Sequence, residues 1–175
     1  MRQHLPKEID AFRFAQTGRE LEGTIDVADM PRLASSLHDN KGEVAVSMRF
    51  GIDPTGTPFV KGHFETVLFL TCERCMQELR LPLQIDTLLG LVKHEKLISN
   101  LTEQYEPWLI ENDALVDPAS IVEDELILAL PLVPKHDDDC LPEEAWFSGD
   151  VEDNEATTEE KVSPFAVLSA LKTKK

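Results

Sequence analysis

Alternation of apolar and polar side chains is the dominant pattern in the N-terminal half of the chain. In the segment 43–52, Val44, Val46, Met48 and Phe50 alternate with small or polar residues. A period of two predicts a β-strand with one buried face. The same pattern, with turn signals between the segments, predicts further strands over residues 21–27, from Pro58 on past Gly62, up to Thr71 before the cysteine pair, and over 79–85. They are expected to pair as an antiparallel meander of four or five strands.

The clearest helix signal lies later in the chain. Asp117 can cap a helix whose first residue is Pro118, and Pro131 can end it. Between them, Val122 and Leu126 fall on one stripe, with Ala129 and Leu130 beyond them. The pattern predicts a helix that packs across the sheet.

The remaining segments are less regular. A short helix is expected over residues 29–37, and residues 103–108 are expected to form a loop with aromatic side chains. Residues 1–20 leave helix and irregular arm equally open.

Together these elements predict an α+β fold, in which an antiparallel sheet or a small, partly open barrel carries a packed helix. The predicted organisation is an α+β domain at 1–136, an acidic disordered linker at 137–162, and a short amphipathic binding helix at 163–175. In that last helix, the side chains expected to contact a partner are Phe165, Val167, Leu168 and Leu171.

Charge narrows the classes of partner. The formal net charge is −16, and residues 137–160 contain acidic but no basic side chains. Tight binding of bare nucleic acid by the whole surface is disfavoured, because that affinity comes from cationic side chains that displace counterions. A basic protein partner is favoured instead. No apolar run is long enough to span a membrane and no signal peptide is evident, so we expect a cytoplasmic protein.

Cysteine spacing supplies a candidate metal site. Cys72 and Cys75 are separated by two residues in a predicted turn, a spacing at which both thiolates can reach one zinc ion. His136 and Cys140 follow the predicted helix and could complete the ligand set. The alternative is that Cys72 and Cys75 are ordinary reduced cysteines at a hairpin tip. The sequence establishes no cofactor, and zinc is the one candidate.

Four basic residues around the predicted hairpin could form a local cationic patch that contacts RNA through Arg74 and Arg80; they are Arg74, Arg80, Lys93 and Lys96. Scattered surface charge is the preferred explanation of these residues. No nucleophile, phosphate-binding or hydrolytic metal motif is present. We therefore expect no catalytic residues, no small-molecule substrate and no enzyme.

Several distinctive stretches together resemble one known family. They are Leu70–Cys75 (LTCERC), Tyr105–Pro107, Val122–His136 (VEDELILALPLVPKH) and Ser163–Lys172 (SPFAVLSALK), in the family's order. On these residues the chain resembles the YceD family of large ribosomal RNA subunit accumulation proteins. The resemblance implies a non-enzymatic cytoplasmic factor for the synthesis, processing or stability of 23S rRNA. Some relatives carry further cysteines after the helix, like a completed zinc site, where this chain has Cys140 alone.

Two hypotheses follow for the molecular role. In the first, the protein is an acidic adaptor that links large-subunit assembly intermediates to a basic ribosomal or rRNA-processing protein. In the second, it binds rRNA directly through a zinc-stabilised CxxC turn.

Overall fold

The computed structural model of the protein describes residues 5–111 and 114–141. The chain divides into two units, Met1–Leu141 and Pro142–Lys175, and the described residues all belong to the first. The elements in chain order are α1 (Ala11–Thr17), β1 (Glu20–Asp26), the 3₁₀ turn η1 (Val27–Asp29), α2 (Pro31–Ala34), β2 (Glu43–Ile52), β3 (Pro58–Thr71), β4 (Glu78–Val92), the 3₁₀ turn η2 (Glu95–Asn100), β5 (Glu106–Leu109) and α3 (Pro118–Ala129).

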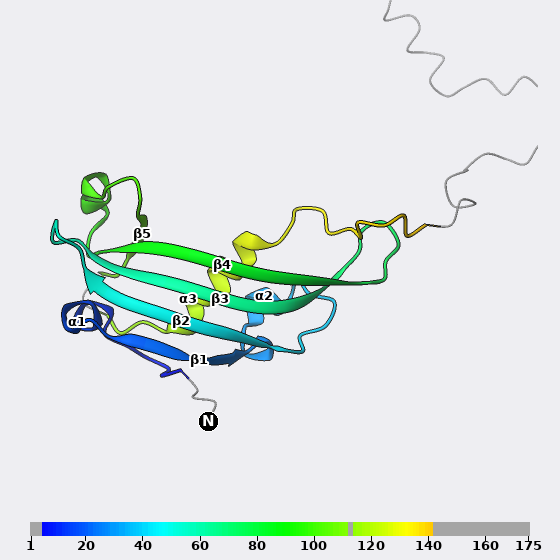
Figure 1. Cartoon of the computed structure of the whole chain (residues 1–175), viewed down its shortest axis with the longest axis horizontal. Helices are drawn as coiled ribbons and strands as arrows, with labels where there is room; N and C mark the ends of the chain where they lie inside the picture. The colour runs from blue at the N-terminus through cyan, green and yellow to red at the C-terminus, as the bar shows by residue number, and fades with distance from the viewer. Residues whose placement is uncertain (1–4, 112–113, 142–175) are drawn as a thin grey trace, which may run out of the picture. The chain divides into compact units, whose positions relative to one another are not determined.

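The strands form one sheet in the order β1-β2-β3-β4-β5 (Figure 1). Neighbours pair antiparallel from β1 to β4, whereas β5 lies parallel to the end of β4. The predicted α+β class is therefore confirmed, with a mixed open sheet as its form and not a barrel. The expectation of a loop over residues 103–108 was wrong at its end, because Pro107 and Trp108 lack an alternating pattern yet pair through their backbone with β4.

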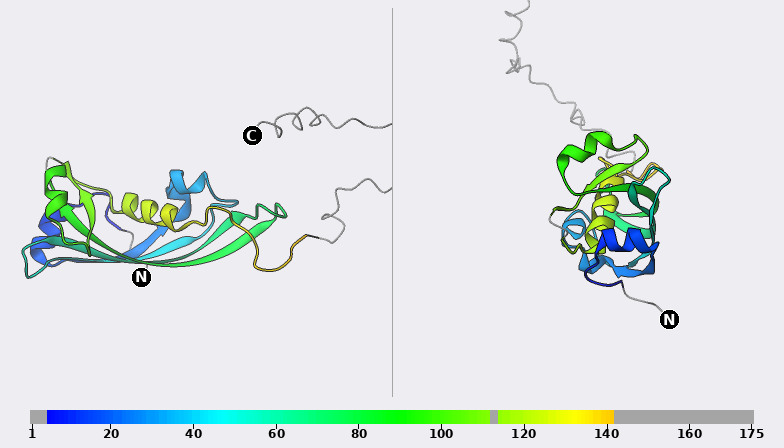
Figure 2. Two further views of the ribbon diagram at one scale, coloured as in Figure 1. Left: turned by 90° about the horizontal axis from the view of Figure 1, so that it is seen from above. Right: turned by 90° about the vertical axis from the view of Figure 1, so that its left-hand side faces the viewer.

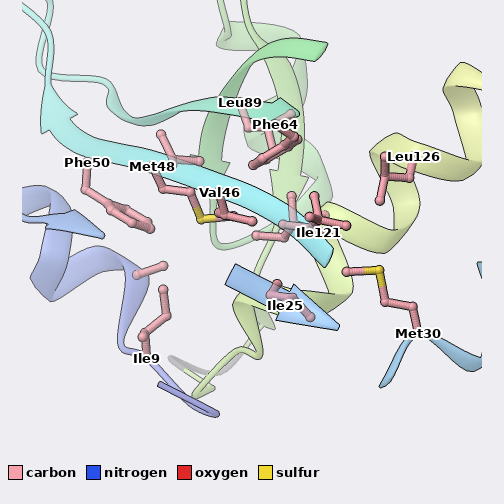
Figure 3. Packing of buried hydrophobic residues seen from close by; sticks show 14 of the residues in the cluster. Ile9, Ile25, Met30, Val46, Met48, Phe50, Phe64, Leu89, Ile121 and Leu126 are labelled. Carbon is pink, nitrogen blue, oxygen red and sulfur yellow. The ribbon is translucent and has the colours of Figure 1, made fainter. Parts of the chain in front are cut away.

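One face of the sheet carries the core. Even-numbered residues of β2 and β3 and odd-numbered residues of β4 point to this face, as the period-two pattern predicts. Their side chains pack with residues from the flanking helices and turns (Figure 3); this cluster includes Ile9, Ile25, Met30, Val46, Met48, Phe50, Phe64, Leu89, Ile121 and Leu126.

The helices lie on that same side of the sheet (Figure 2). The carboxylate of Asp117 accepts a hydrogen bond from the Ala119 amide at 2.9 Å and caps α3, which confirms the predicted start. Asp10 caps α1 in the same way, by accepting from the Arg13 amide. In the expected 29–37 helix, only Pro31–Ala34 is α-helical.

The polar contact between α2 and α3 is buried. Glu123 of α3 is 6% exposed and accepts hydrogen bonds from the backbone amides of Arg32 and Leu33, at 2.7 and 3.1 Å. The Arg32 guanidinium donates to the same carboxylate. These bonds join the start of α2 to the middle of α3.

The long β3–β4 hairpin extends beyond the segment that the helices cover (Figure 2). Pro82 pairs with Val67 of β3, and β5 pairs only with residues 89–92 of β4, so at Pro82 the strand has no sheet partner on its other side. A proline is tolerated there because no ladder hydrogen bond is lost. In the described part of the chain, no helix is long and apolar enough to cross a membrane.

Candidate metal centre

The turn between β3 and β4 holds two cysteines close together. The Cys72 amide donates to the Gln77 carbonyl at 2.8 Å, and the Met76 amide donates to the Cys72 carbonyl at the same distance. Met76 adopts a left-handed backbone, with φ of 59°, which closes the turn. Cys72 is fully buried and Cys75 is half-buried, so their side chains point inward from the tip of the hairpin.

The segment after α3 brings the other two candidate ligands to this turn. Pro131 ends the helix, and the Glu73 amide then donates to the Pro134 carbonyl at 2.8 Å. That bond fixes the path of the chain beside the hairpin tip. His136 and Cys140, which are far from the cysteine pair in sequence, are thereby placed against it.

The four predicted ligands do come together. One ligand atom from each of Cys72, Cys75, His136 and Cys140 lies within 4.8 Å of all the others. Zinc–sulfur bonds of about 2.3 Å and zinc–nitrogen bonds of about 2.1 Å place tetrahedral ligands about 3.8 Å (S to S) and about 3.6 Å (S to N) apart. The Sγ atoms of Cys72 and Cys140 are 3.8 Å apart, and Cys75 Sγ is 3.5 Å from His136 Nδ1. This arrangement could hold a metal ion, and the spacing fits zinc.

The histidine is oriented for this role. His136 Nε2 lies 3.0 Å from the carbonyl oxygen of Glu78, which can only accept, so Nε2 carries the proton. The other nitrogen, Nδ1, is then free of a proton in the neutral ring and faces the sulfur atoms. A second hydrogen bond of this kind is the usual way in which a metal-binding histidine is held in one tautomer.

Local donors favour negative charge on two of the three sulfurs. Burial raises the pKa of the Cys72 thiol, but hydrogen bonds from the backbone amides of Cys75 and His136 outweigh it and lower that pKa to about 5. Burial acts the same way on Cys140, where hydrogen bonds from Arg74 and His136 prevail and leave the pKa below its usual value. Burial raises the pKa of Cys75. Since the thiolate is the form that binds metal, the site suits a cation.

Arg74, predicted as a member of an RNA-contacting patch, takes part in this cluster. Its Nε lies 3.0 Å from Cys140 Sγ, and its guanidinium also donates to the carbonyls of His136 and Asp138. The side chain is 26% exposed. Sequence reasoning missed this role, for which the position of the arginine between the two cysteines was the available signal.

Arg80 lies elsewhere. It is on β4, opposite Phe69 of β3, with its side chain exposed on the face of the sheet away from the helices. The structure therefore does not bring the two predicted RNA-contacting arginines into one cationic cluster. The predicted partner-binding residues Phe165, Val167, Leu168 and Leu171 lie outside the described residues.

Comparison with known proteins supplies the context for this site. Residues 60–172 match the family described as "Large ribosomal RNA subunit accumulation protein YceD". The chain is also 32% identical over 173 residues to a protein of that name from Haemophilus influenzae, with 97% of each chain covered. No solved structure matches.

Proposed function

Because this chain belongs to the YceD family of large ribosomal RNA subunit accumulation proteins, we propose that it promotes that accumulation as a non-enzymatic acidic adaptor. Its direct partner would be a basic ribosomal or rRNA-processing protein on large-subunit assembly intermediates, in the cytoplasm. The adaptor presents negative charge to the partner and keeps it associated with the assembling particle.

The observation that carries this proposal is the location of the cations. The chain has a net charge of −16. The guanidinium of Arg74, which stands between the two cysteines, donates to Cys140 Sγ and to the His136 carbonyl. Of the other members of the predicted patch, Arg80 is exposed on β4, whereas Lys93 and Lys96 follow the end of β4 that is remote from the turn. Cations spread in this way supply less of the counterion release on which affinity for a nucleic-acid backbone depends than a single basic cluster would.

We propose further that the ligand cluster binds zinc and that the ion is structural. Four protein ligands complete a tetrahedral coordination shell and leave no position for water or substrate. Bound there, zinc would join the hairpin tip to the segment that follows α3. That role agrees with a factor that binds partners and does not catalyse a reaction.

The first experiment measures binding of the full chain to purified large-subunit ribosomal proteins across a series of salt concentrations. The adaptor proposal predicts that at least one basic protein binds and that affinity falls as salt rises, because the attraction is Coulombic. Affinity that is independent of salt, or absence of any basic partner, would contradict it.

A second experiment tests the C-terminal segment as a docking element. Replacing Phe165 and Leu168 by aspartate in the full chain should weaken partner binding if their apolar side chains enter a groove on the partner. A matched variant with aspartate at Ser169 and Thr173 adds the same charge at polar positions. Equal binding by both variants would show that the C-terminal segment is not the docking element and would leave the acidic surface of the rest of the chain as the docking surface.

The alternative function is direct RNA binding by a zinc-stabilised turn. The clustering of Cys72, Cys75, His136 and Cys140 would give such a module a fixed turn once zinc is bound. This alternative predicts crosslinks from rRNA to peptides that contain Arg74 or Arg80. A zinc-loaded protein without such crosslinks would rule it out.

A further inference from the structure

We infer that the face of the sheet opposite the helices is a docking groove for a basic polypeptide segment with apolar side chains. The inference rests on the proposed adaptor function and names the surface that would carry it. None of the described helices covers this face (Figure 2).

The groove crosses the sheet along one row of paired residues. Thr24 of β1 pairs with Ala45 of β2, which pairs with Glu65 of β3, which pairs with Gln84 of β4. Side chains of this row line a hollow of about 780 Å³. Because Ala45 and Glu65 are exposed, the hollow is open to solvent along its length and suits a polypeptide better than an enclosed small molecule.

The floor of the groove is apolar. Val67 and Phe69 point to this face from β3 and are only half-buried, and Pro82 lies beside Val67 on β4. Half-buried aliphatic and aromatic side chains on an open sheet face can gain further burial from a partner's apolar residues.

The walls of the groove are acidic. Glu43 and Glu65 line the hollow, and a second hollow that shares Ala45 and Glu65 is lined also by Glu22 and His63. Neither lining includes a lysine or an arginine among the described residues. Acidic walls around an apolar floor match a segment in which lysine or arginine alternates with apolar residues. The basic side chains would contact the acidic walls, and the apolar side chains would contact the floor.

Charge near the two ends bounds the acidic stretch. Arg80 lies opposite Phe69, toward the tip of the β3–β4 hairpin. Toward the opposite end of the sheet, Arg49 forms an ion pair with Glu20. Between them, the ring of His63 contacts Asp86 and Glu65, at 2.8 and 3.2 Å. A basic segment would therefore lie across the central row and not along the whole hairpin.

The test uses a short synthetic peptide in which lysine alternates with valine, added to the full zinc-loaded chain. We expect saturable binding that shifts the NMR signals of Val67 and Phe69.

Replacing Glu22 and Glu65 together by lysine should lower the affinity for this peptide about tenfold or more, because two attractive contacts become repulsive. A control with lysine at Glu95 and Glu103, which line neither hollow, changes net charge equally and should bind as the parent does.

A second peptide, in which glutamate replaces lysine, should not bind, and one in which serine replaces valine should bind more weakly. Equal weakening by the groove and control variants would reduce the effect to overall charge and overturn the inference. The proposed adaptor function would be contradicted separately, by a parent chain that binds no basic large-subunit protein. The groove alone would be contradicted if such a protein binds the Glu22 and Glu65 double variant as tightly as it binds the parent.

Other occupants would also overturn the inference. Signal changes at Val67 and Phe69 on replacing Lys172, Lys174 and Lys175 by serine, without added peptide, would assign the groove to the chain's own C-terminal segment. Concentration-dependent self-association that is lost on charge reversal would assign it to a second copy of the chain.

Discussion

The hairpin tip and the open face of the sheet differ in what their charged side chains contact. At the hairpin tip, Arg74 turns inward and donates to Cys140 and to the carbonyls of the 136–140 loop. On the open sheet face, Glu22 and Glu65 line a surface exposed to solvent. Arg74, the member of the predicted RNA patch that lies in the turn, is thus held by internal contacts. Glu22 and Glu65 are exposed, and although Glu65 also contacts His63 and Gln84, both carboxylates can be reached by a partner. The difference favours a basic protein over RNA as the ligand of this molecule.

The largest expected effect is that of losing a metal ligand, which should change both the metal content and the order of the hairpin tip. Changing Cys72 to serine removes a buried thiolate, and we expect metal content to fall from about one zinc per chain to near zero after dialysis against a chelator. Amide hydrogen exchange at the hairpin tip should accelerate, because the ion no longer joins the tip to the 136–140 loop. Mass spectrometry of metal content and of exchange measures both.

The matched control for that variant is His94→Ala, which removes an imidazole outside the cluster. It should retain zinc and its exchange protection. If the parent protein, expressed and purified with zinc present, holds no metal, the structural role proposed for the site is wrong.

The next largest effect concerns an acid that is structural and not available to partners. Glu123→Ala leaves the part-buried amide of Arg32 and the buried amide of Leu33 without their acceptor and should lower the free energy of unfolding by about 2–4 kcal/mol. Glu65→Ala, on the open face, should leave the urea midpoint nearly unchanged. Similar losses for both variants would contradict the distinction between buried and available acids.

The pH dependence of stability should follow Glu123. Burial raises its pKa, but hydrogen bonds from the Leu33 amide and from Arg32 outweigh burial and hold the pKa below its usual value. A depressed carboxyl pKa adds stability above the unfolded pKa, and this stability is lost as the pH falls through the folded pKa. Urea unfolding between neutral and acidic pH should show this loss in the parent and less of it in Glu123→Gln.

A smaller effect is expected from the two arginines. Arg74→Ala removes donors to Cys140 and to two carbonyls of the loop, so metal affinity should fall about 10–100-fold, the range found for residues that orient ligands. Arg80→Ala should not change metal affinity. A competition titration with a chelating dye compares them. Equal metal affinity, with loss of RNA crosslinks in both variants, would instead support the cationic patch.

The smallest effect is a titration on the open face. Hydrogen bonds to Asp86 and Glu65 raise the pKa of His63. Those contacts stabilise the fold below the unfolded pKa of about 6.5 and are lost as the pH rises through the folded pKa. Asp86→Asn should move the NMR titration midpoint of His63 downward. A midpoint that does not move would show that this ion pair does not form in solution.

The sequence predicted most of the sheet because one face of each long strand is buried. Val44, Val46, Met48 and Phe50 had to share a face once β2 was a strand, and the capping residues of α3 fixed its start. The parallel pairing of β5 was not predictable from Pro107 and Trp108, since backbone hydrogen bonds to β4 leave no periodic pattern. Helix α1 was also open in the sequence, where its caps Asp10 and Gly18 surround only seven residues.

The candidate metal site, too, was predictable only in part. Spacing identified the cysteine pair, and proximity to the end of α3 suggested His136 and Cys140. What spacing could not supply was the direction of Arg74, or the Glu78 carbonyl that orients His136, because both depend on how the segment after Pro134 folds back on the turn. The groove was equally hidden, because Glu22 and Glu65 are far apart in sequence and meet only through strand pairing.

The most direct test of the contrast between the two regions is the affinity of the full, zinc-loaded chain for naked 23S rRNA at physiological ionic strength. The account predicts binding no tighter than non-specific contact, with a Kd weaker than about 10⁻⁶ M. Sub-micromolar binding to naked rRNA, with crosslinks at Arg74 or Arg80, would contradict it.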